Sequence, residues 1–321
     1  MSSRPLSSLV LPRASLSKLT RAGYTTVQEL RITSAESLAE SLQIPVLDAE
    51  AILSLAQRPL TQTQTMPLTQ SAASMASNTQ KLSTRSSAVD SILSGGLSQG
   101  HILEVSGTPG SPKETVAINV AISFVEAGHE VMFIDCQNMT SPAKLDRALQ
   151  TSQNLPPNYT RLVYHLSMQS LPELMVWLHN LPSLLDSYND VALLVLNSMS
   201  FPFQGVHSIP AKTALLEKIK QTFTRLTARN LTIVITSQLS TKILNADGSS
   251  GSFDTGAKGI MVPQLGPSYL PPGKTHRIIF AAEGQRSGFI KLISSPKHEK
   301  GAGAGLSPSI PYEVTREGQI R

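Results

Sequence analysis

Short apolar segments that recur between helical stretches constrain the fold of this chain more than any other feature. Five of them are nearly continuous apolar runs: HILEVSG, EVMFID, RLVYHL, VALLVLN and LTIVITS. Between them lie helical stretches such as KETVAINVAISFVEAG, LPELMVWLHNLPSLL and AKTALLEKIKQTFTRLTARN. Strands that are apolar throughout are typical of a mostly parallel sheet covered by helices on both faces. The sequence therefore predicts an α/β core.

Two further apolar segments, RIIFAAE and GFIKLIS, follow near the end of the chain. Gly284 and Gly288 mark the short connection between them. Closely spaced strands joined by a glycine-containing turn are typical of a hairpin. We expect an antiparallel hairpin at one edge of the sheet.

The N-terminal part of the chain differs in composition from the core. Residues 59–80 contain no charged and no aromatic residue, so they cannot supply a core face, and we interpret them as a linker. Before them, short apolar-periodic helices alternate with stop signals at Gly23 and Pro45 and a start signal at Thr33 or Ser34. The predicted organisation is a helical, helix-hairpin-helix-like module over 1–58, the linker 59–80 and the core over 81–321.

The composition excludes several classes of protein. A single cysteine, Cys136, rules out an internal disulfide framework and a multi-cysteine metal site, and it fits a reducing compartment as a buried small residue. No stretch reaches the roughly 18 apolar residues that a membrane span needs, so we expect a soluble intracellular protein without membrane contact.

The positive charge is concentrated near the C-terminus. The net charge is +5, and after residue 270 eight Lys and Arg face four Glu. A mildly basic balance permits contact with nucleic acid without requiring it. We select Lys297 and Lys300 in this tail as candidate DNA-binding residues.

The segment SGTPGSPKETVAI, residues 106–118, lies between a predicted strand and a predicted helix, where a phosphate-binding loop belongs. Such a loop has the pattern GxxxxGK followed by Ser or Thr, because its N–H groups and Lys hold phosphate and its hydroxyl holds Mg²⁺. Gly107 and Lys113 keep this spacing. Pro112 replaces the second glycine and offers no N–H, and Glu114 replaces the hydroxyl.

The order of these parts resembles the RecA-type strand-exchange recombinases of eukaryotes. The helical module, the linker, SSAVDSILSGGLSQGHILEVSG, the Lys113 loop, VMFIDCQ, ALLVLN and IVITSQLSTKI follow one another as in that family. The segments LNSMSFPF and MVPQLGPSYLPPGKTHRIIF are most similar to its C-type paralogues. The resemblance extends from about residue 8 to residue 315 and implies a RecA-type core.

The resemblance implies an ATP site with Mg²⁺, and several of its residues depart from the family. The cofactor-binding positions are those of the degenerate loop: Gly107, Gly110, Lys113, Glu114 and Thr115. Thr115 stands one residue late for the metal, and we expect Glu114 to bring a negative charge close to the triphosphate. We therefore expect binding of ATP and Mg²⁺ to be weak or absent.

The catalytic positions that the resemblance assigns are also altered. The family has a Glu that activates the attacking water where this chain has Gln137, and an Asp that orients Mg²⁺ where it has Asn197. An amide cannot take a proton from water, and losing a general base costs roughly 10²- to 10⁴-fold in rate. Only Gln238 matches the family's sensor glutamine. We expect no catalytic residue and little or no catalysis.

The DNA-contacting elements of the family differ here too. The glycine-rich segment between Ile243 and Pro263 carries one cation, Lys258, against Asp247 and Asp254. A loop that follows phosphates should be basic. We therefore expect a disordered surface loop, with Lys258 as its candidate DNA contact.

The helical module lacks the glycine turn with which relatives bind backbone phosphate. Ile44 and Pro45 stand at that turn, and Asp48 and Glu50 follow it. Negative charges disfavour phosphate, so we interpret the module as a protein-interaction or packing unit.

Three further residues have structural explanations. Trp177 has helical spacing to Leu174, Leu178 and Leu181 and is expected in the core. His165 and His179 lie in apolar surroundings without spaced partners, so we expect no metal site.

The resemblance implies a nuclear protein of homologous-recombination DNA repair. We expect a mainly non-catalytic subunit of a heteromeric complex with other recombinase-family paralogue subunits. Such a complex would act on the recombinase filament and contact single-stranded DNA directly or through the partner. Two alternatives stay open: an active DNA-dependent ATPase of the family, and a pure scaffold subunit without DNA contact.

Overall fold

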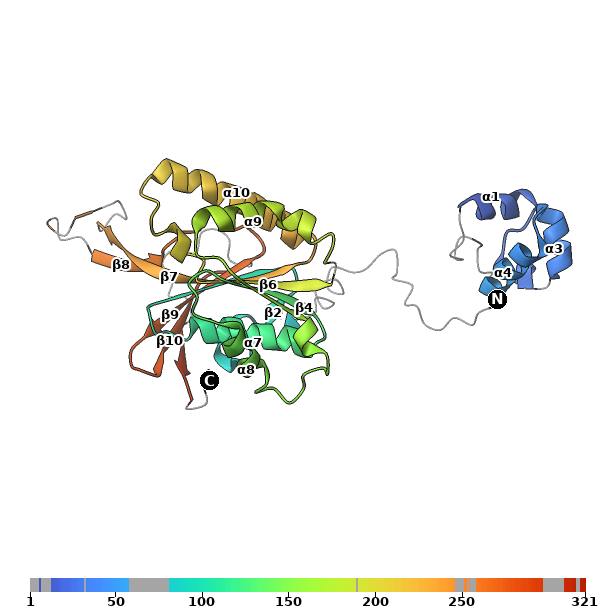
Figure 1. The fold of residues 1–321 in the computed structure, drawn as a ribbon. Helices are drawn as coiled ribbons and strands as arrows, with labels where there is room; N and C mark the ends of the chain where they lie inside the picture. Colours follow the sequence, from blue (N-terminus) through green and yellow to red (C-terminus); the bar gives the residue numbers. More distant parts are fainter. Residues whose placement is uncertain are drawn as a thin grey trace. The chain divides into compact units, whose positions relative to one another are not determined.

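The computed structural model describes residue 6 and residues 13–31, 33–57, 81–188, 190–245, 251–252, 254, 258–296, 309–315 and 318–321. These residues fall into two compact units, one within Met1–Ser71 and one within Ala72–Arg321 (Figure 1). The whole of the predicted linker 59–80 lies outside the described residues.

The first unit is a small helical module. Its helices are α1 (Arg13–Arg21), α2 (Val27–Arg31), α3 (Ala35–Leu42) and α4 (Val46–Gln57). Ser34 caps α3 by accepting a hydrogen bond from the N–H of Ser37, and Gln43 ends the helix in the left-handed region with φ 52°. Leu19, Leu30 and Leu38 are fully buried in its core. An apolar face on each short helix thus builds one common core.

The second unit is built on a nine-stranded sheet. Its strands are β3 (Ile102–Gly107), β4 (Glu130–Asp135), β5 (Val163–Ser167), β6 (Val191–Asn197), β7 (Thr232–Leu244), β8 (Lys258–Pro263), β9 (Thr275–Ala282), β10 (Ser287–Ser294) and β11 (Ser309–Glu313). The order is β11-β10-β9-β3-β7-β6-β4-β5, and β8 pairs with β7. The pairs from β9 to β5 are parallel. The predicted α/β core with a mostly parallel sheet is confirmed.

Helices cover both faces of this sheet. They are α6 (Ser87–Ile92), α7 (Lys113–Glu126), α8 (Pro142–Leu149), α9 (Leu171–Leu184) and α10 (Ile209–Ala228). In Figure 1, α9 and α10 lie on one side of the sheet and α7 and α8 on the other. Two apolar clusters result, one on each side. A short ladder of β1 (Lys81–Leu82) and β2 (Leu97–Ser98) precedes β3.

The C-terminal hairpin is present, and it is extended by a strand that we did not predict. β9 and β10 pair antiparallel as expected. β11 then pairs with β10, so it forms the edge of the sheet.

The prediction of a disordered surface loop between Ile243 and Pro263 is partly wrong. β7 continues to Leu244, and its last six residues pair antiparallel with β8, so that Leu244 faces Lys258. Lys258 and Gly259 thus belong to a strand rather than to a loop. Residues 246–250, 253 and 255–257 lie outside the described residues.

A buried ion pair connects β3 with β9. The carboxylate of Glu104 is fully buried and lies 2.5 Å from Nε of Arg277. It also accepts a hydrogen bond of 2.6 Å from the hydroxyl of Tyr269. Burial, followed by the negative charge of Glu104, raises the pKa of Tyr269 well above its ordinary value. The hydrogen bond from Tyr269 ties the segment before β9 to the centre of the sheet.

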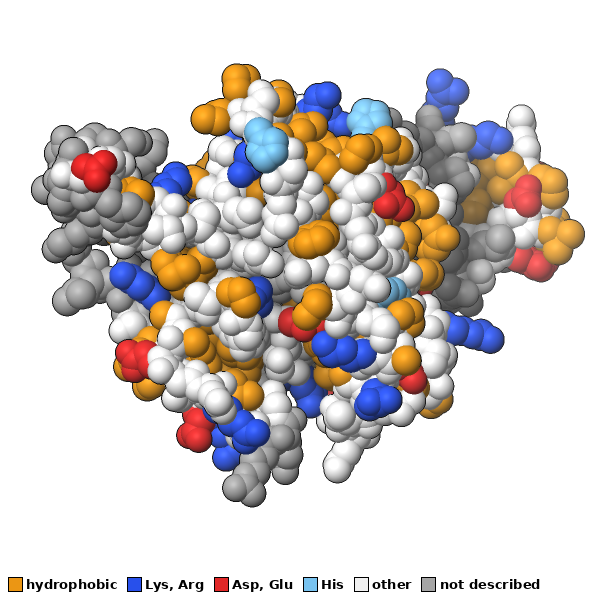
Figure 2. Space-filling model, turned by 60° about the vertical axis from the view of Figure 1, so that its left-hand side comes forward, with side chains coloured by type: hydrophobic (Ala, Val, Ile, Leu, Met, Phe, Trp, Pro, Cys, Tyr) orange, Lys and Arg blue, Asp and Glu red, His pale blue; other side chains and the backbone are white. Residues whose placement is uncertain are grey.

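Figure 2 views the second unit from the side of β7 to β10. Ile260 and Met261 of β8 and Phe289 and Ile293 of β10 are exposed. Hydrophobic side chains are interspersed with polar ones on this face, and Lys and Arg side chains are scattered over it. In the part of the chain that the structure describes, no helix is long and apolar enough to cross a membrane.

The three residues to which we gave structural explanations differ in burial. Trp177 is half-buried and packs against the core of the second unit, as expected. His165 is half-buried. His179 is exposed, so the prediction of apolar surroundings for His179 is wrong. Within the described ranges, no group of three His, Cys, Asp or Glu could hold a metal ion.

Candidate functional site

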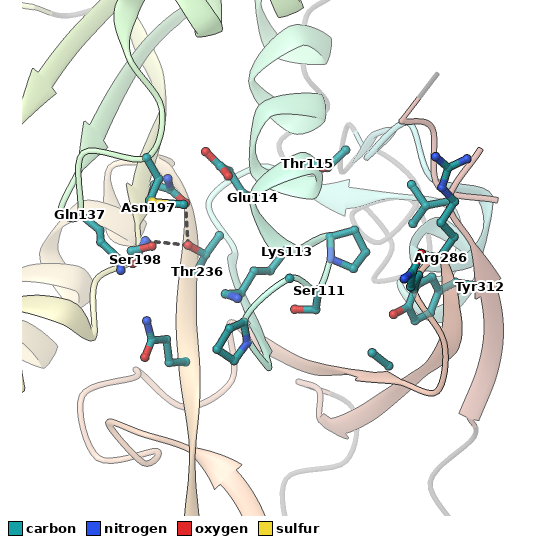
Figure 3. Close-up of a pocket in the computed structure, with 18 of the residues that line it drawn as sticks. Ser111, Lys113, Glu114, Thr115, Gln137, Asn197, Ser198, Thr236, Arg286 and Tyr312 are labelled. Atoms are coloured by element: carbon teal, nitrogen blue, oxygen red, sulfur yellow. Dashed lines mark hydrogen bonds between the residues drawn. The ribbon is translucent and has the colours of Figure 1, made fainter. Parts of the chain in front are cut away.

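Except for Gly107, the residues that the sequence predicted for a nucleotide site all line one cavity of about 390 Å³ (Figure 3). The loop between β3 and α7 forms one wall, and Gln137, Asn197 and Gln238 form another. The lining comprises Pro109, Gly110, Ser111, Pro112, Lys113, Glu114, Thr115, Gln137, Met139, Asn197, Ser198, Thr236, Gln238, Ala282, Gly284, Gln285, Arg286, Tyr312 and Val314. The carboxyl ends of parallel strands converge at one edge of a sheet, which explains this convergence.

The loop between β3 and α7 joins the end of a strand to the start of a helix, which is the setting that a phosphate-binding loop requires. A Cβ at Gly107 would lie 2.2 Å from Oγ of Ser111, so a side chain there would displace the Ser111 hydroxyl from Thr108. Gly110 has a φ of +82°, which also favours glycine. Pro112 caps α7 with a φ of −78°, a value that proline adopts readily. The path is therefore compatible with proline, although one N–H is lost.

Lys113 is bonded to its own loop. Its Nζ lies 2.9 Å from the main-chain oxygen of Thr108. The N–H and the hydroxyl of Ser111 bond to the same oxygen at 3.1 and 2.8 Å. Burial lowers the pKa of Lys113, and the negative charge of Glu114 partly opposes this effect. One of the three N–H donors of Lys113 is therefore used within its own loop.

The carboxylate of Glu114 is bonded to two residues that follow β4. Its carboxylate accepts a very short hydrogen bond from the hydroxyl of Thr140 and one of 3.0 Å from Nζ of Lys144. Figure 3 shows Glu114 pointing away from Lys113, with Thr115 on another side of α7. The negative charge that we expected at this position is therefore present, and it is paired with the ammonium group of Lys144.

Asn197 is held in a hydrogen-bond network at the end of β6. Its Oδ1 accepts from the hydroxyl of Thr236 at 2.7 Å, and its Nδ2 donates to Oγ1 of Thr140 at 3.3 Å. The same Thr236 oxygen accepts from the N–H of Ser198 at 2.6 Å (Figure 3). The side chain is buried, so this amide is fixed by its neighbours.

Gln137 and Gln238 complete this wall. The N–H of Gln137 donates to the buried carboxylate of Asp135 at 3.1 Å. The main chain of Gln238 bonds to Oγ of Ser200 at 3.0 Å and to the N–H of Gln264 at 2.9 Å. Hydrogen bonds to neighbouring residues thus hold the main chain of both glutamines in place, and both residues line the cavity.

The wall from β9 to β11 was missed by the sequence analysis. Arg286 lies in the β9–β10 turn, and Tyr312 lies in β11. Tyr312 packs against Phe280 with ring centroids 5.0 Å apart, and burial raises its pKa. It stands opposite Gly288, where a Cβ would lie 2.9 Å from its ring. The conspicuous glycine of GFIKLIS was the one signal that could have indicated a large opposing side chain.

The cavity does not fit Mg²⁺. The metal position of the loop carries Glu114, whose carboxylate is bonded to Thr140 and to the ammonium group of Lys144. A dication would have to displace that ammonium group or lie close to it, which like charges disfavour. Asn197 offers an amide that is already bonded on both of its polar atoms. For a nucleotide alone, Gly107, Gly110 and Lys113 remain in place.

The DNA-binding candidates are placed only in part. Lys258 begins β8, and its side chain is not described. Lys297 and Lys300 lie outside the described residues.

Comparison with known proteins gave distant relatives. No protein-family model matches the chain. The DNA repair protein RAD51 homolog 3 of Dictyostelium discoideum is 27% identical over 258 residues, covering 72% of this chain and 63% of that protein. Its namesake from Cricetulus griseus is 24% identical over 265 residues, covering 72% and 66%. The DNA repair and recombination protein RadA of Metallosphaera sedula is 24% identical over 205 residues, covering 61% and 62%. The chain spans slightly less than two thirds of these relatives.

Proposed function

We propose that this chain is a mainly non-catalytic subunit in homologous-recombination repair. The proposal starts from its homology to the RAD51 homolog 3 proteins and from its resemblance to RecA-type recombinase paralogues. The similarity to DNA repair proteins of the recombinase family supports this proposal. The subunit works in a heteromeric complex with other members of the recombinase family. This complex loads or stabilises the recombinase filament in the nucleus.

One observation carries the proposal: the polar groups that would serve ATP hydrolysis are bonded to the chain itself. Lys113 bonds to Thr108, Glu114 bonds to Lys144 and Thr140, and Asn197 bonds to Thr236. Gln137 at the wall has no proton-accepting carboxylate, which costs roughly 10²- to 10⁴-fold in rate. A subunit of this kind contributes its surface rather than its chemistry.

The active DNA-dependent ATPase remains the second candidate, because one observation favours it. The cavity keeps a volume of about 390 Å³ with Lys113 and Gln238 in its wall. A pocket of this size is in the range of small-molecule sites. A nucleotide that displaced Lys113 from Thr108 would find room there.

The measurement that separates the two candidates is ATP turnover by the purified full chain, with and without single-stranded DNA. We expect no turnover above that of Lys113→Ala, which serves as the matched control. Turnover that DNA stimulates and that Lys113→Ala loses would establish the ATPase instead.

A second measurement tests the complex. Affinity purification of the chain from its own cells should recover another recombinase-family subunit. Recovery of a monomer, with no family member enriched, would contradict the proposed mediator role.

A further inference from the structure

Thr140 is the centre of a buried polar cluster beside the cavity. The residue is fully buried, and its N–H donates to Oδ2 of Asp135 at 2.5 Å. Its main-chain oxygen accepts from Nε2 of His165 at 2.7 Å. Its hydroxyl donates to the carboxylate of Glu114 and accepts from the amide of Asn197. Each polar group of Thr140 therefore has a partner, and the partners come from α7, β4, β5 and β6.

Lys144 brings a positive charge to the same place. Its Nζ lies 3.0 Å from Oε1 of Glu114 and 3.0 Å from the main-chain oxygen of Met139. Lys144 lies in the first turn of α8, and Ser141 caps that helix through the N–H of Lys144. The capped helix thus holds the lysine beside the start of α7.

We propose that Glu114, Thr140 and Lys144 together replace the divalent cation at this cavity. A metal at a phosphate-binding loop supplies positive charge beside the first turn of the helix and is held there by a loop hydroxyl. Here Lys144 supplies the charge and Thr140 supplies the hydroxyl. The start of α7 is therefore tied to the β4–α8 turn without a metal.

The consequence concerns how the site is ordered. Glu114 is only partly exposed, and its hydrogen bond to Thr140 is buried on one side, so this contact is more than an exposed ion pair. The loop holds its conformation whether or not a divalent cation is in solution. The inference rests on the proposed function in so far as both describe a cavity that does not use Mg–ATP.

Thermal melting of the full chain tests this directly. The wild type is melted in millimolar MgCl₂ and in excess EDTA, and the two melting temperatures should agree. Glu114→Gln and Thr140→Val should each lower the melting temperature by several degrees. The double variant should lose less stability than the sum of the two single losses, because both changes weaken the contact between Glu114 and Thr140. If Thr140→Val does not fold, the same comparison of single and double variants is made with Lys144→Met and Glu114→Gln.

The matched control is the exposed pair Glu217 and Lys220, whose charged atoms are 4.0 Å apart on α10. Glu217→Gln and Lys220→Met should leave the melting temperature nearly unchanged and show no coupling. Mg²⁺ that raised the melting temperature of the wild type but not of Glu114→Gln would make the carboxylate a metal ligand and overturn the proposal. Additive effects of the Glu114 and Thr140 changes, or of Glu114 and Lys144 in the second comparison, would also overturn it.

These outcomes are distinct from those of the turnover assay. ATP turnover with an intact coupling would refute the non-catalytic role alone. Absent turnover with additive variants would refute the cluster alone.

Discussion

The ammonium nitrogen of Lys113 lies 2.9 Å from the main-chain oxygen of Thr108, within the loop to which both residues belong. Ser111 donates twice to the same oxygen. In a phosphate-binding loop this lysine holds phosphate, whereas here it forms a hydrogen bond within its own loop. This hydrogen bond stabilises the loop, so we expect two measurable effects from one substitution.

Lys113→Ala should lower the free energy of unfolding by about 1 kcal/mol, the usual net worth of one hydrogen bond. Urea unfolding measures it. Millimolar Mg–ATP should leave the melting temperature nearly unchanged in both proteins, and the variant should be close to silent in repair assays. Saturation at 100 times the dissociation constant would add about 2.7 kcal/mol, so a rise present only in the wild type would contradict this prediction.

Arg277→Met should destabilise the core strongly. It leaves the fully buried Glu104 without its counter-charge, and breaking a buried pair costs about 3–5 kcal/mol. Arg229→Met is the control, because Arg229 and Asp186 form an exposed pair at 2.8 Å that is worth about 1 kcal/mol or less. Urea unfolding of both variants gives the difference. Equal losses would show that burial of Glu104 does not set the energy of its ion pair.

Alkaline pH should destabilise the protein through Cys136. Burial, with a contribution from Asp135, raises the pKa of this thiol from 9.0 to about 12. Above pH 9 the unfolded chain loses the thiol proton while the folded chain keeps it, so stability falls as pH rises, by up to about 1.4 kcal/mol per pH unit. In Cys136→Ala the slope of unfolding free energy against pH should be smaller by that amount. Unchanged slopes would mean that the thiol ionises equally in both states.

Lys297→Glu combined with Lys300→Glu tests the basic tail. If the tail contacts DNA, the complex should bind single-stranded DNA more weakly, and the loss should be larger at low salt. The dependence of log affinity on log salt should become shallower by about one for each phosphate that the tail no longer neutralises. Lys220→Glu on α10 is the control. Unchanged binding at every salt concentration would assign DNA contact to the partner.

Much of the fold could be predicted because burial on two faces leaves a direct mark on the sequence. VALLVLN and LTIVITS are nearly continuous apolar runs because α7, α9 and α10 cover both sides of their strands. Gln137, Asn197 and Gln238 could be brought together because each ends or closely follows such an apolar segment of the sequence.

The bonding of these residues could not be predicted. Thr140 and Lys144 stand 26 and 30 positions from Glu114, and nothing in the sequence marks them as its partners. Glu114 considered alone therefore looks like an unpaired charge. β11 escaped prediction because SIPYE is short and contains a proline, and the Tyr312 wall was missed with it.

The interdependence of Glu114, Thr140, Lys144 and Asn197 has an evolutionary consequence. Replacing Glu114 alone by a hydroxyl residue leaves Lys144 without its counter-charge and removes the carboxylate that accepts from the buried Thr140 hydroxyl. Replacing Asn197 alone by Asp removes the amide that donates to Thr140 and brings a second carboxylate into the cluster. Each of these single substitutions towards the family residue thus removes stabilising contacts. A return to metal binding therefore needs several substitutions together. In homologues, the residues at these four positions should change together.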